Sequence, residues 1–451
     1  MAKRALLFSL VSVFFAAFLS ASPAQVADEP PCAVHEGTPF NEAAHIKFAC
    51  SSTRPLTERA SHREFALKLG ALAAIATPKL SWKQIDPMQE PARYAKALLE
   101  YGIKDNQGVD WRIEDNKAST WCHAPWFQDL RERLRGMTLE RGSRPFELHA
   151  RQQAFSQNWA IGFYNDVACR RLALVWKDPA SPKTKDFAFP DGSYAIKLLF
   201  TAAAPSEVPY LAGSLEWDAA IGEKGEVTRM RLLQVDVAVK DNRLNGVSGW
   251  FFGTFMYDAG TPGNTPYERL TPVGVTWGND PTLTAFQYEQ RGKAVRESWV
   301  NPAVAEKFFA LPRHTLGLFG RLNGPVDNPK SSCIACHGQA LDWGRAITRG
   351  SLAEVSAGLL MPGPPQDPYD DGVVGRYFLN LGTASFVNGT QPLDYSLQVA
   401  LGIKNFRAWV FANYPQMADQ ATDVPKFGFP TDPFDAVPLA PTEPSMELFK
   451  R

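Results

Sequence analysis

Residues 331–338, with the sequence Ser-Ser-Cys-Ile-Ala-Cys-His-Gly, constrain this chain more than any other stretch. Near the start of a helix, Cys333 and Cys336 would lie one turn apart on one face, so both sulfur atoms could reach the same edge of a bound group. His337 would emerge directly beneath that group, where a ring nitrogen can bind a metal. The pattern therefore predicts covalent attachment of a c-type haem through both thiols, with His337 as the proximal iron ligand.

Two other uses of paired cysteines fit the sequence less well. A zinc site would need further ligands at short spacing, but the other cysteines are scattered singly along the chain, at Cys32, Cys50, Cys122 and Cys169. A thiol redox pair needs no histidine after it and is typically preceded by a βα unit, which residues 324–329 do not resemble. We therefore favour haem over zinc or dithiol chemistry.

Through this motif, residues of about 300–420 resemble the c-type cytochromes, in particular their single-haem class I fold. That fold implies a haem-attachment helix, a loop with a methionine and a closing helix, in this order. A helical pattern over residues 394–413, with Asp394 as a suitable N-cap, provides the closing helix. The resemblance implies an all-α haem domain whose closing helix covers the cofactor.

The ligand opposite His337 decides the chemistry of such a haem. A filled distal position favours electron transfer, whereas an empty one can bind or activate a small ligand. The resemblance implies Met361 as the distal ligand, in a loop that the following proline helps to hold extended. Met417, a histidine such as His314 or His123, or no ligand at all remain alternatives.

The first residues predict export. Lys3 and Arg4 precede an apolar run over residues 5–19, and small residues follow at 20–24, which is the layout of a secretory signal peptide cleaved after Ala24. The bacterial cytochromes that this chain resembles are matured outside the cytoplasm, so we expect a periplasmic protein. No other segment has enough consecutive apolar residues to cross a bilayer, and we expect no membrane span after cleavage.

An oxidising compartment also predicts disulfides among the four cysteines outside the motif. Three pairings are possible. We favour Cys32 with Cys50 and Cys122 with Cys169, because this combination closes the shorter loops.

The balance of charges limits the choice of partners. The chain has 47 basic and 47 acidic residues, so no net charge attracts it to nucleic acid or to an anionic membrane surface. We predict no nucleic-acid partner. A redox partner protein is expected, but the sequence does not identify it.

The 451 residues divide into four regions, and the predicted fold class is a multi-domain α+β protein. Residues 1–24 form the signal peptide and residues 25–150 a mostly helical region. Within the latter, helical spacing marks residues 63–75 and 90–101, and Pro91 suits the start of the second helix. Residues 151–295 form a β-rich domain, and residues 296–451 the cytochrome c-like haem domain.

Period-two alternation of apolar residues marks the β-rich domain. The predicted strands are 158–164, 171–176, 194–200, 233–239, 249–257 and 273–277. Because no helical pattern separates them, we expect an antiparallel sandwich or an open barrel.

These features predict an exported monohaem cytochrome c that transfers single electrons. Whether the protein is also an enzyme stays open, and no catalytic residue is assigned. The alternatives are a haem-dependent oxidoreductase or peroxidase whose β-rich domain binds the substrate, and a haem-based sensor.

Overall fold

The computed structural model of the chain describes residues 80–113, 115–119, 121–123, 134–176, 182–221, 226–304, 317–327, 331–342 and 377–403. Several predictions fall outside these residues. They are the signal peptide, the helix at 63–75, the disulfide between Cys32 and Cys50, and the possible iron ligands His314, Met361 and Met417.

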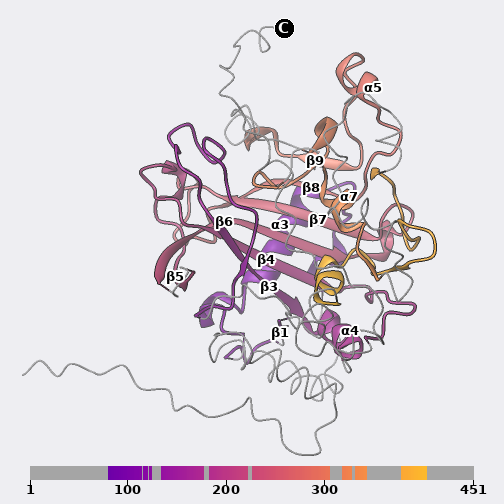
Figure 1. Cartoon of the computed structure of the whole chain (residues 1–451), viewed down its shortest axis with the longest axis horizontal. Coiled ribbons are helices and arrows are strands. Elements are labelled where there is room, and N and C mark those ends of the chain that lie inside the picture. Colours follow the sequence, from indigo (N-terminus) through magenta and orange to yellow (C-terminus); the bar gives the residue numbers. More distant parts are fainter. Residues whose placement is uncertain are drawn as a thin grey trace, which may run out of the picture.

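A nine-stranded antiparallel sheet forms the centre of the described structure (Figure 1). Its order is β1-β3-β4-β6-β7-β8-β9, with β2 also paired to β3 and β5 to β6. The strands are β1 Trp121–Cys122, β2 Thr138–Leu139, β3 Asn158–Asn165, β4 Tyr194–Thr201, β5 Glu216–Ala220, β6 Val227–Lys240, β7 Trp250–Tyr257, β8 Leu270–Thr276 and β9 Ser298–Val300. This confirms an α+β protein with an antiparallel β-rich centre.

Helices and short 3-10 turns connect and cover the strands. The helices are α3 Pro91–Ile103, α4 Asp166–Val175, α5 Ala285–Glu289 and α7 Cys333–His337, and the 3-10 turns are η1 Ser81–Gln84, η2 Gln107–Val109, η3 Pro209–Leu211, η4 Asn242–Leu244 and η5 Leu318–Gly320. The predicted helix at 90–101 is confirmed as α3, with Pro91 in its first turn. Within the described residues, no helix combines the length and apolar character that crossing a bilayer requires.

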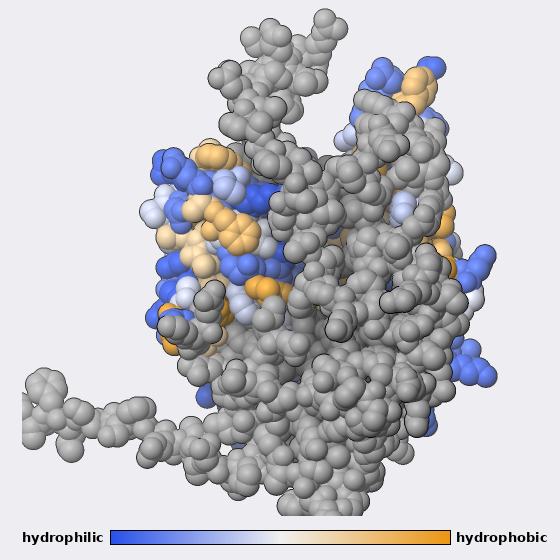
Figure 2. Space-filling view, in the orientation of Figure 1, coloured by the Kyte–Doolittle hydropathy of each residue, from blue (hydrophilic) through white to orange (hydrophobic). Residues whose placement is uncertain are grey.

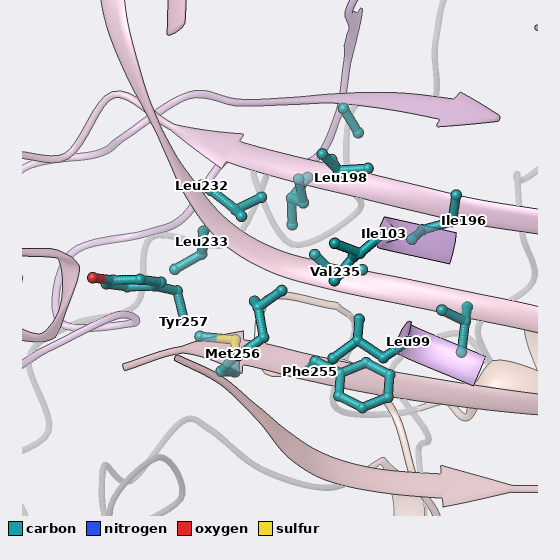
Figure 3. Close-up of a cluster of buried hydrophobic side chains, with 14 of the residues drawn as sticks. Leu99, Ile103, Ile196, Leu198, Leu232, Leu233, Val235, Phe255, Met256 and Tyr257 are labelled. Carbon is teal, nitrogen blue, oxygen red and sulfur yellow. The ribbon is translucent and has the colours of Figure 1, made fainter. Parts of the chain in front are cut away.

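Alternation along the strands gives the sheet two different faces. In β6, Val235, Val237 and Val239 enter the larger core, whereas Ala238 packs against a second core on the opposite face. Helix α3 covers the larger core. Figure 3 shows Leu99 and Ile103 of this helix beside Val235 and Phe255 of the sheet.

The second core joins the other face of the sheet to α4, to α7 and to residues 393–403. Figure 1 shows α7 and the segment 377–403 in front of the sheet, with α3 behind it. The buried members are Cys122, Ala168, Cys169, Leu172, Val175, Trp176, Phe187, Phe189, Trp250, Phe252, Ile334, Ala340, Leu393, Tyr395, Val399 and Ile403. The Cys-x-x-Cys-His segment therefore packs directly on the β-rich part of the chain.

Ion pairs between β5 and β6 place charged side chains on the exposed part of the sheet at β5. Arg229 and Arg231 of β6 form ion pairs of 2.8 and 2.9 Å with Asp218 and Glu216 of β5. Charges on an exposed strand disfavour pairing with another chain. Figure 2 shows hydrophilic and hydrophobic residues interspersed on the described part of the visible surface.

One predicted strand is a helix. Residues 171–175 form the end of α4 and Trp176 is its C-cap, because the Asn165 side chain accepts a hydrogen bond from the Ala168 amide (3.1 Å) and caps a helix there. The buried residues Ala168, Leu172 and Val175 then fall at helical spacing.

Residues 296–451, predicted to form an all-α domain, are not purely helical where the structure describes them. β9 joins the central sheet, and β10 Leu341–Asp342 pairs with β11 Gln391–Pro392. The mostly helical region before residue 150 likewise contributes β1 and β2 to the sheet. Both regions share cores with the strands, since α3 packs on one face of the sheet and α7 on the other.

Part of the predicted closing helix is present, but it starts later than expected, and residues 404–413 lie outside the described part of the chain. Residues 397–403 are helical, and the Ser396 hydroxyl accepts a hydrogen bond from the Val399 amide (3.3 Å) at its start. Asp394 does not cap it. Its carboxylate instead accepts hydrogen bonds from Lys240, Trp250 and the Phe189 amide.

Candidate functional site

The Cys-x-x-Cys-His segment forms a single helical turn, α7, as the sequence predicts. The Ser332 hydroxyl caps it by accepting from the Ala335 amide (2.9 Å), and the Gly338 amide donates to the Ile334 carbonyl (2.8 Å). Ser332 in turn donates to Asn279 (2.6 Å), which fixes the start of the turn to the loop after β8. The cap places Cys333 and Cys336 three residues apart on one helical face.

Close backbone contacts hold the segment in place from the N-terminal side. The Leu318 amide donates to the Ser331 carbonyl (2.9 Å), and the Cys333 amide donates to the Leu322 carbonyl (3.1 Å). Gly317 permits this approach, since any side chain there would collide with the Ser331 carbonyl.

Cys333 and Cys336 are free, partly buried thiols. Burial raises the pKa of Cys336 to about 11, although a hydrogen bond from Ser331 opposes the shift. Burial also raises the pKa of Cys333 well above its ordinary value, and the nearby Asp327 and Asp236 carboxylates add to this. Both thiols are therefore neutral at physiological pH. A reactive dithiol pair needs a depressed pKa, and this environment gives the reverse.

The imidazole of His337 is held by one hydrogen bond and one ring contact. Its Nδ1 lies 2.9 Å from the carbonyl oxygen of Tyr395, and its ring centroid lies 4.6 Å from that of Phe252 in β7. Burial lowers the pKa of His337 to about 4, so the ring is neutral at physiological pH. With the proton on Nδ1, Nε2 keeps the lone pair that a metal ligand needs.

These residues fit a covalently attached haem. Two protonated thiols on one face match the two thioether bonds, and a neutral histidine beside the second cysteine, oriented through Nδ1, matches an axial ligand. Within the part of the chain that the structure describes, no group of three His, Cys, Asp or Glu side chains is arranged to hold a metal ion.

A polar group lies on the sheet near the motif. Lys197 of β4 and Asp236 of β6 are cross-strand neighbours whose charged atoms lie 3.3 Å apart, and their side chains keep 34% and 21% exposure. Opposite Lys197 stands Gly162 of β3, where the nearest described atom to an added Cβ would be the Ile196 carbonyl oxygen at 4.0 Å. This part of the sheet face therefore carries a charged pair on β4 and β6 and no side chain at Gly162.

The second core also contains the predicted disulfide between Cys122 and Cys169, which is confirmed. It links the end of β1 to α4, on the same face of the sheet as Ile334.

His123, the one described alternative iron ligand, does not share the surroundings of His337. Its ring centroid lies 4.7 Å from that of Phe163, which belongs to the larger core on the α3 side. His337 contacts Phe252, in the second core. The structure therefore does not bring these two histidines together.

Several residues of the site carried no clear sequence signal. Tyr395 contributes only a backbone carbonyl, which any residue could supply. Lys240 and Asp394 form a buried ion pair of 2.7 Å between segments that are distant in sequence. The one available hint was Lys240, a charged residue in the alternating pattern of β6. A central strand that is covered on both faces seldom carries an unpaired charge.

Comparison of the chain with protein-family models, with curated proteins and with solved structures finds no match.

Proposed function

We propose that this protein is an exported c-type cytochrome that carries one haem on Cys333 and Cys336, with His337 as the proximal ligand, and transfers single electrons. The observation that carries the proposal is the hydrogen bond between His337 Nδ1 and the Tyr395 carbonyl. The helical turn that contains His337 also presents two free thiols. Histidine ligands generally make such a bond with their second nitrogen.

The chain's own residues would bind, orient and bury the group. Ser332 caps the turn that presents both thiols, and Tyr395 and Phe252 set the position of the imidazole ring. The haem supplies the reversible one-electron change at iron when it is bound. Ile334 and Ala340 share the second core with Trp250 and Phe252 of β7, so the sheet would form part of the surroundings of the haem.

Three further parts of the proposal rest on the sequence alone. They are the periplasmic location, the distal ligand Met361, and the organisation of residues 296–451 as a cytochrome c-like domain. Cys333 and Cys336 are free, whereas Cys122 and Cys169 form a disulfide in the core against which Cys333 packs, which supports the proposal that only the motif cysteines react with the cofactor.

A second candidate is a haem-dependent oxidoreductase or sensor. The partly exposed pair Lys197 and Asp236, on the central strands near Cys333, favours it because a polar surface beside a cofactor can bind a substrate. A five-coordinate iron that binds carbon monoxide rapidly would favour this candidate over electron transfer.

The direct test is production of the full chain in a bacterial host that is competent in cytochrome c maturation. The expected product is coloured, retains haem after denaturation, and has the mass of the processed chain plus one haem. The double variant Cys333→Ala/Cys336→Ala should be colourless under the same conditions. A colourless wild-type protein at its apo mass would refute the proposal.

A further inference from the structure

The carbonyl that accepts from His337 lies in a turn of unusual backbone geometry. Asp394 has φ 45° and Tyr395 has φ 64°, so two consecutive non-glycine residues occupy the left-handed region. L-residues with a Cβ adopt this region at an energetic cost, and they keep it only where their surroundings impose it. The contacts that hold this turn therefore decide where the Tyr395 carbonyl points.

The Asp394 side chain provides those contacts. Its Oδ1 accepts from Lys240 Nζ (2.7 Å) and from Trp250 Nε1 (2.9 Å), and its Oδ2 accepts from the Phe189 amide (2.7 Å). The donors come from the end of β6, the start of β7 and the segment before β4. One carboxylate thus ties the turn to three separate parts of the molecule.

This carboxylate is almost completely removed from water. The Asp394 and Lys240 side chains are 4% and 7% exposed. Hydrogen bonds between charged groups are strong and directional in such surroundings, so the turn has little freedom to shift.

Strand β7 connects the turn to the histidine a second time. Trp250 donates to Asp394, and Phe252, two residues later on the same face, contacts the ring of His337. The imidazole is therefore placed between two groups that the same strand positions.

We propose that Asp394 is a positioning residue for the proximal histidine, which rests on the proposed attachment of haem at His337. It holds the Tyr395 carbonyl in line with Nδ1 of His337, and so fixes the ring orientation and the electron donation of Nε2 to iron. A hydrogen-bond acceptor held in place at Nδ1 makes Nε2 more basic. A more basic ligand stabilises ferric iron relative to ferrous iron and so lowers the midpoint potential.

The test uses the haem-loaded protein and three variants. Asp394→Asn removes the charge that Lys240 binds, and Lys240→Met/Asp394→Asn removes both charges, so the local net charge stays as in the wild type. Trp250→Phe removes a single donor and keeps an aromatic ring in the core. It provides a milder change should the others fail to fold.

Asp241→Asn is the matched control. Asp241 is also a fully buried carboxylate, but it accepts from Tyr94 (2.7 Å) and Arg243 and pairs with Lys83 (3.2 Å), and none of these partners belongs to the turn. It should lower stability without altering the iron.

The readouts are the midpoint potential and the electron paramagnetic resonance spectrum of the ferric protein. We expect all three variants to have a higher potential and altered g-values, including the charge-balanced double variant, with Trp250→Phe changed least. Wild-type potential and g-values in the loaded double variant and in Trp250→Phe would overturn the role of Asp394. If the wild type carries no haem, the proposed function fails instead, so the two failures are distinguishable.

Discussion

The Lys197 ammonium lies 3.3 Å from the Asp236 carboxylate, across the central strands β4 and β6 and on the face of the sheet on which the Cys-x-x-Cys-His turn packs. Asp236 also accepts from Gln234 (2.8 Å) and Thr254 (2.9 Å). Although burial alone would lower it, the Glu140, Asp236 and Asp327 carboxylates raise the pKa of Lys197. One cation thus lies among three acidic groups, two of which, Asp236 and Asp327, are also near Cys333.

If the proposed haem is attached, loss of negative charge here should raise its reduction potential. The Asp236 carboxylate disfavours the ferrous state, which carries one more negative charge than the ferric state, and Asp236→Asn removes this effect. At an effective dielectric constant of about 20, a nearby charge contributes on the order of 1 kcal/mol, or roughly 40 mV for a one-electron couple. A spectroelectrochemical titration measures the shift. Asp218→Asn, whose side chain is 51% exposed on β5, serves as the control and should leave the potential unchanged.

Glu140 predicts a stability change that depends on pH. Burial raises its pKa above the ordinary value of 4.5, and the protonated form is therefore the one that the folded state prefers. The stability associated with this preference is fully present below pH 4.5 and is lost as pH rises through the folded-state pKa.

Glu140→Gln imitates the protonated form, so it should unfold at higher denaturant concentration than the wild type at neutral pH. The difference should vanish well below the ordinary glutamate pKa. Urea denaturation at both pH values measures it, and equal midpoints at neutral pH would contradict the prediction. Glu100→Gln, on the exposed face of α3, is a suitable control.

Local signals predicted the motif and most of the sheet. The turn at Cys333 forms where the sequence places it, because Ser332 is a neighbouring cap and the residues involved are consecutive. The strands with strict alternation are present for a similar reason, since one buried face imposes the period of two. The β-branched and aromatic residues within 171–176 wrongly predicted a strand, although Asn165, which caps the helix, precedes them.

Contacts between distant segments could not be predicted in this way. Asp394 is as suitable for a helix N-cap as for a buried ion pair, and only the position of Lys240 decides between them. The pairing of Lys197 with Asp236 depends on the register of β4 and β6, which shifts at a bulge between Leu199 and Phe200. A backbone acceptor such as Tyr395 has no signature in its side chain.

The disulfide between Cys122 and Cys169 should contribute strongly to stability. It closes a loop with a sequence separation of 47, for which loss of chain entropy in the unfolded state gives about 4 kcal/mol. Cys122→Ala/Cys169→Ala should therefore lower the free energy of unfolding by about 2–5 kcal/mol in chemical denaturation. The reduced wild type is the matched comparison, and a loss below about 1 kcal/mol in both would contradict this estimate.

The distal ligand of the proposed haem can be tested separately. If Met361 binds the iron, the loaded wild type should be low-spin and show the absorption band of methionine bound to ferric iron. Met361→Ala should lose that band and bind carbon monoxide rapidly in the ferrous state, because a thioether ligand has been replaced by an open position. Met417→Ala should behave as the wild type. A band that persists in Met361→Ala and disappears in Met417→Ala would transfer the role to Met417, whereas a five-coordinate wild type would favour the oxidoreductase or sensor.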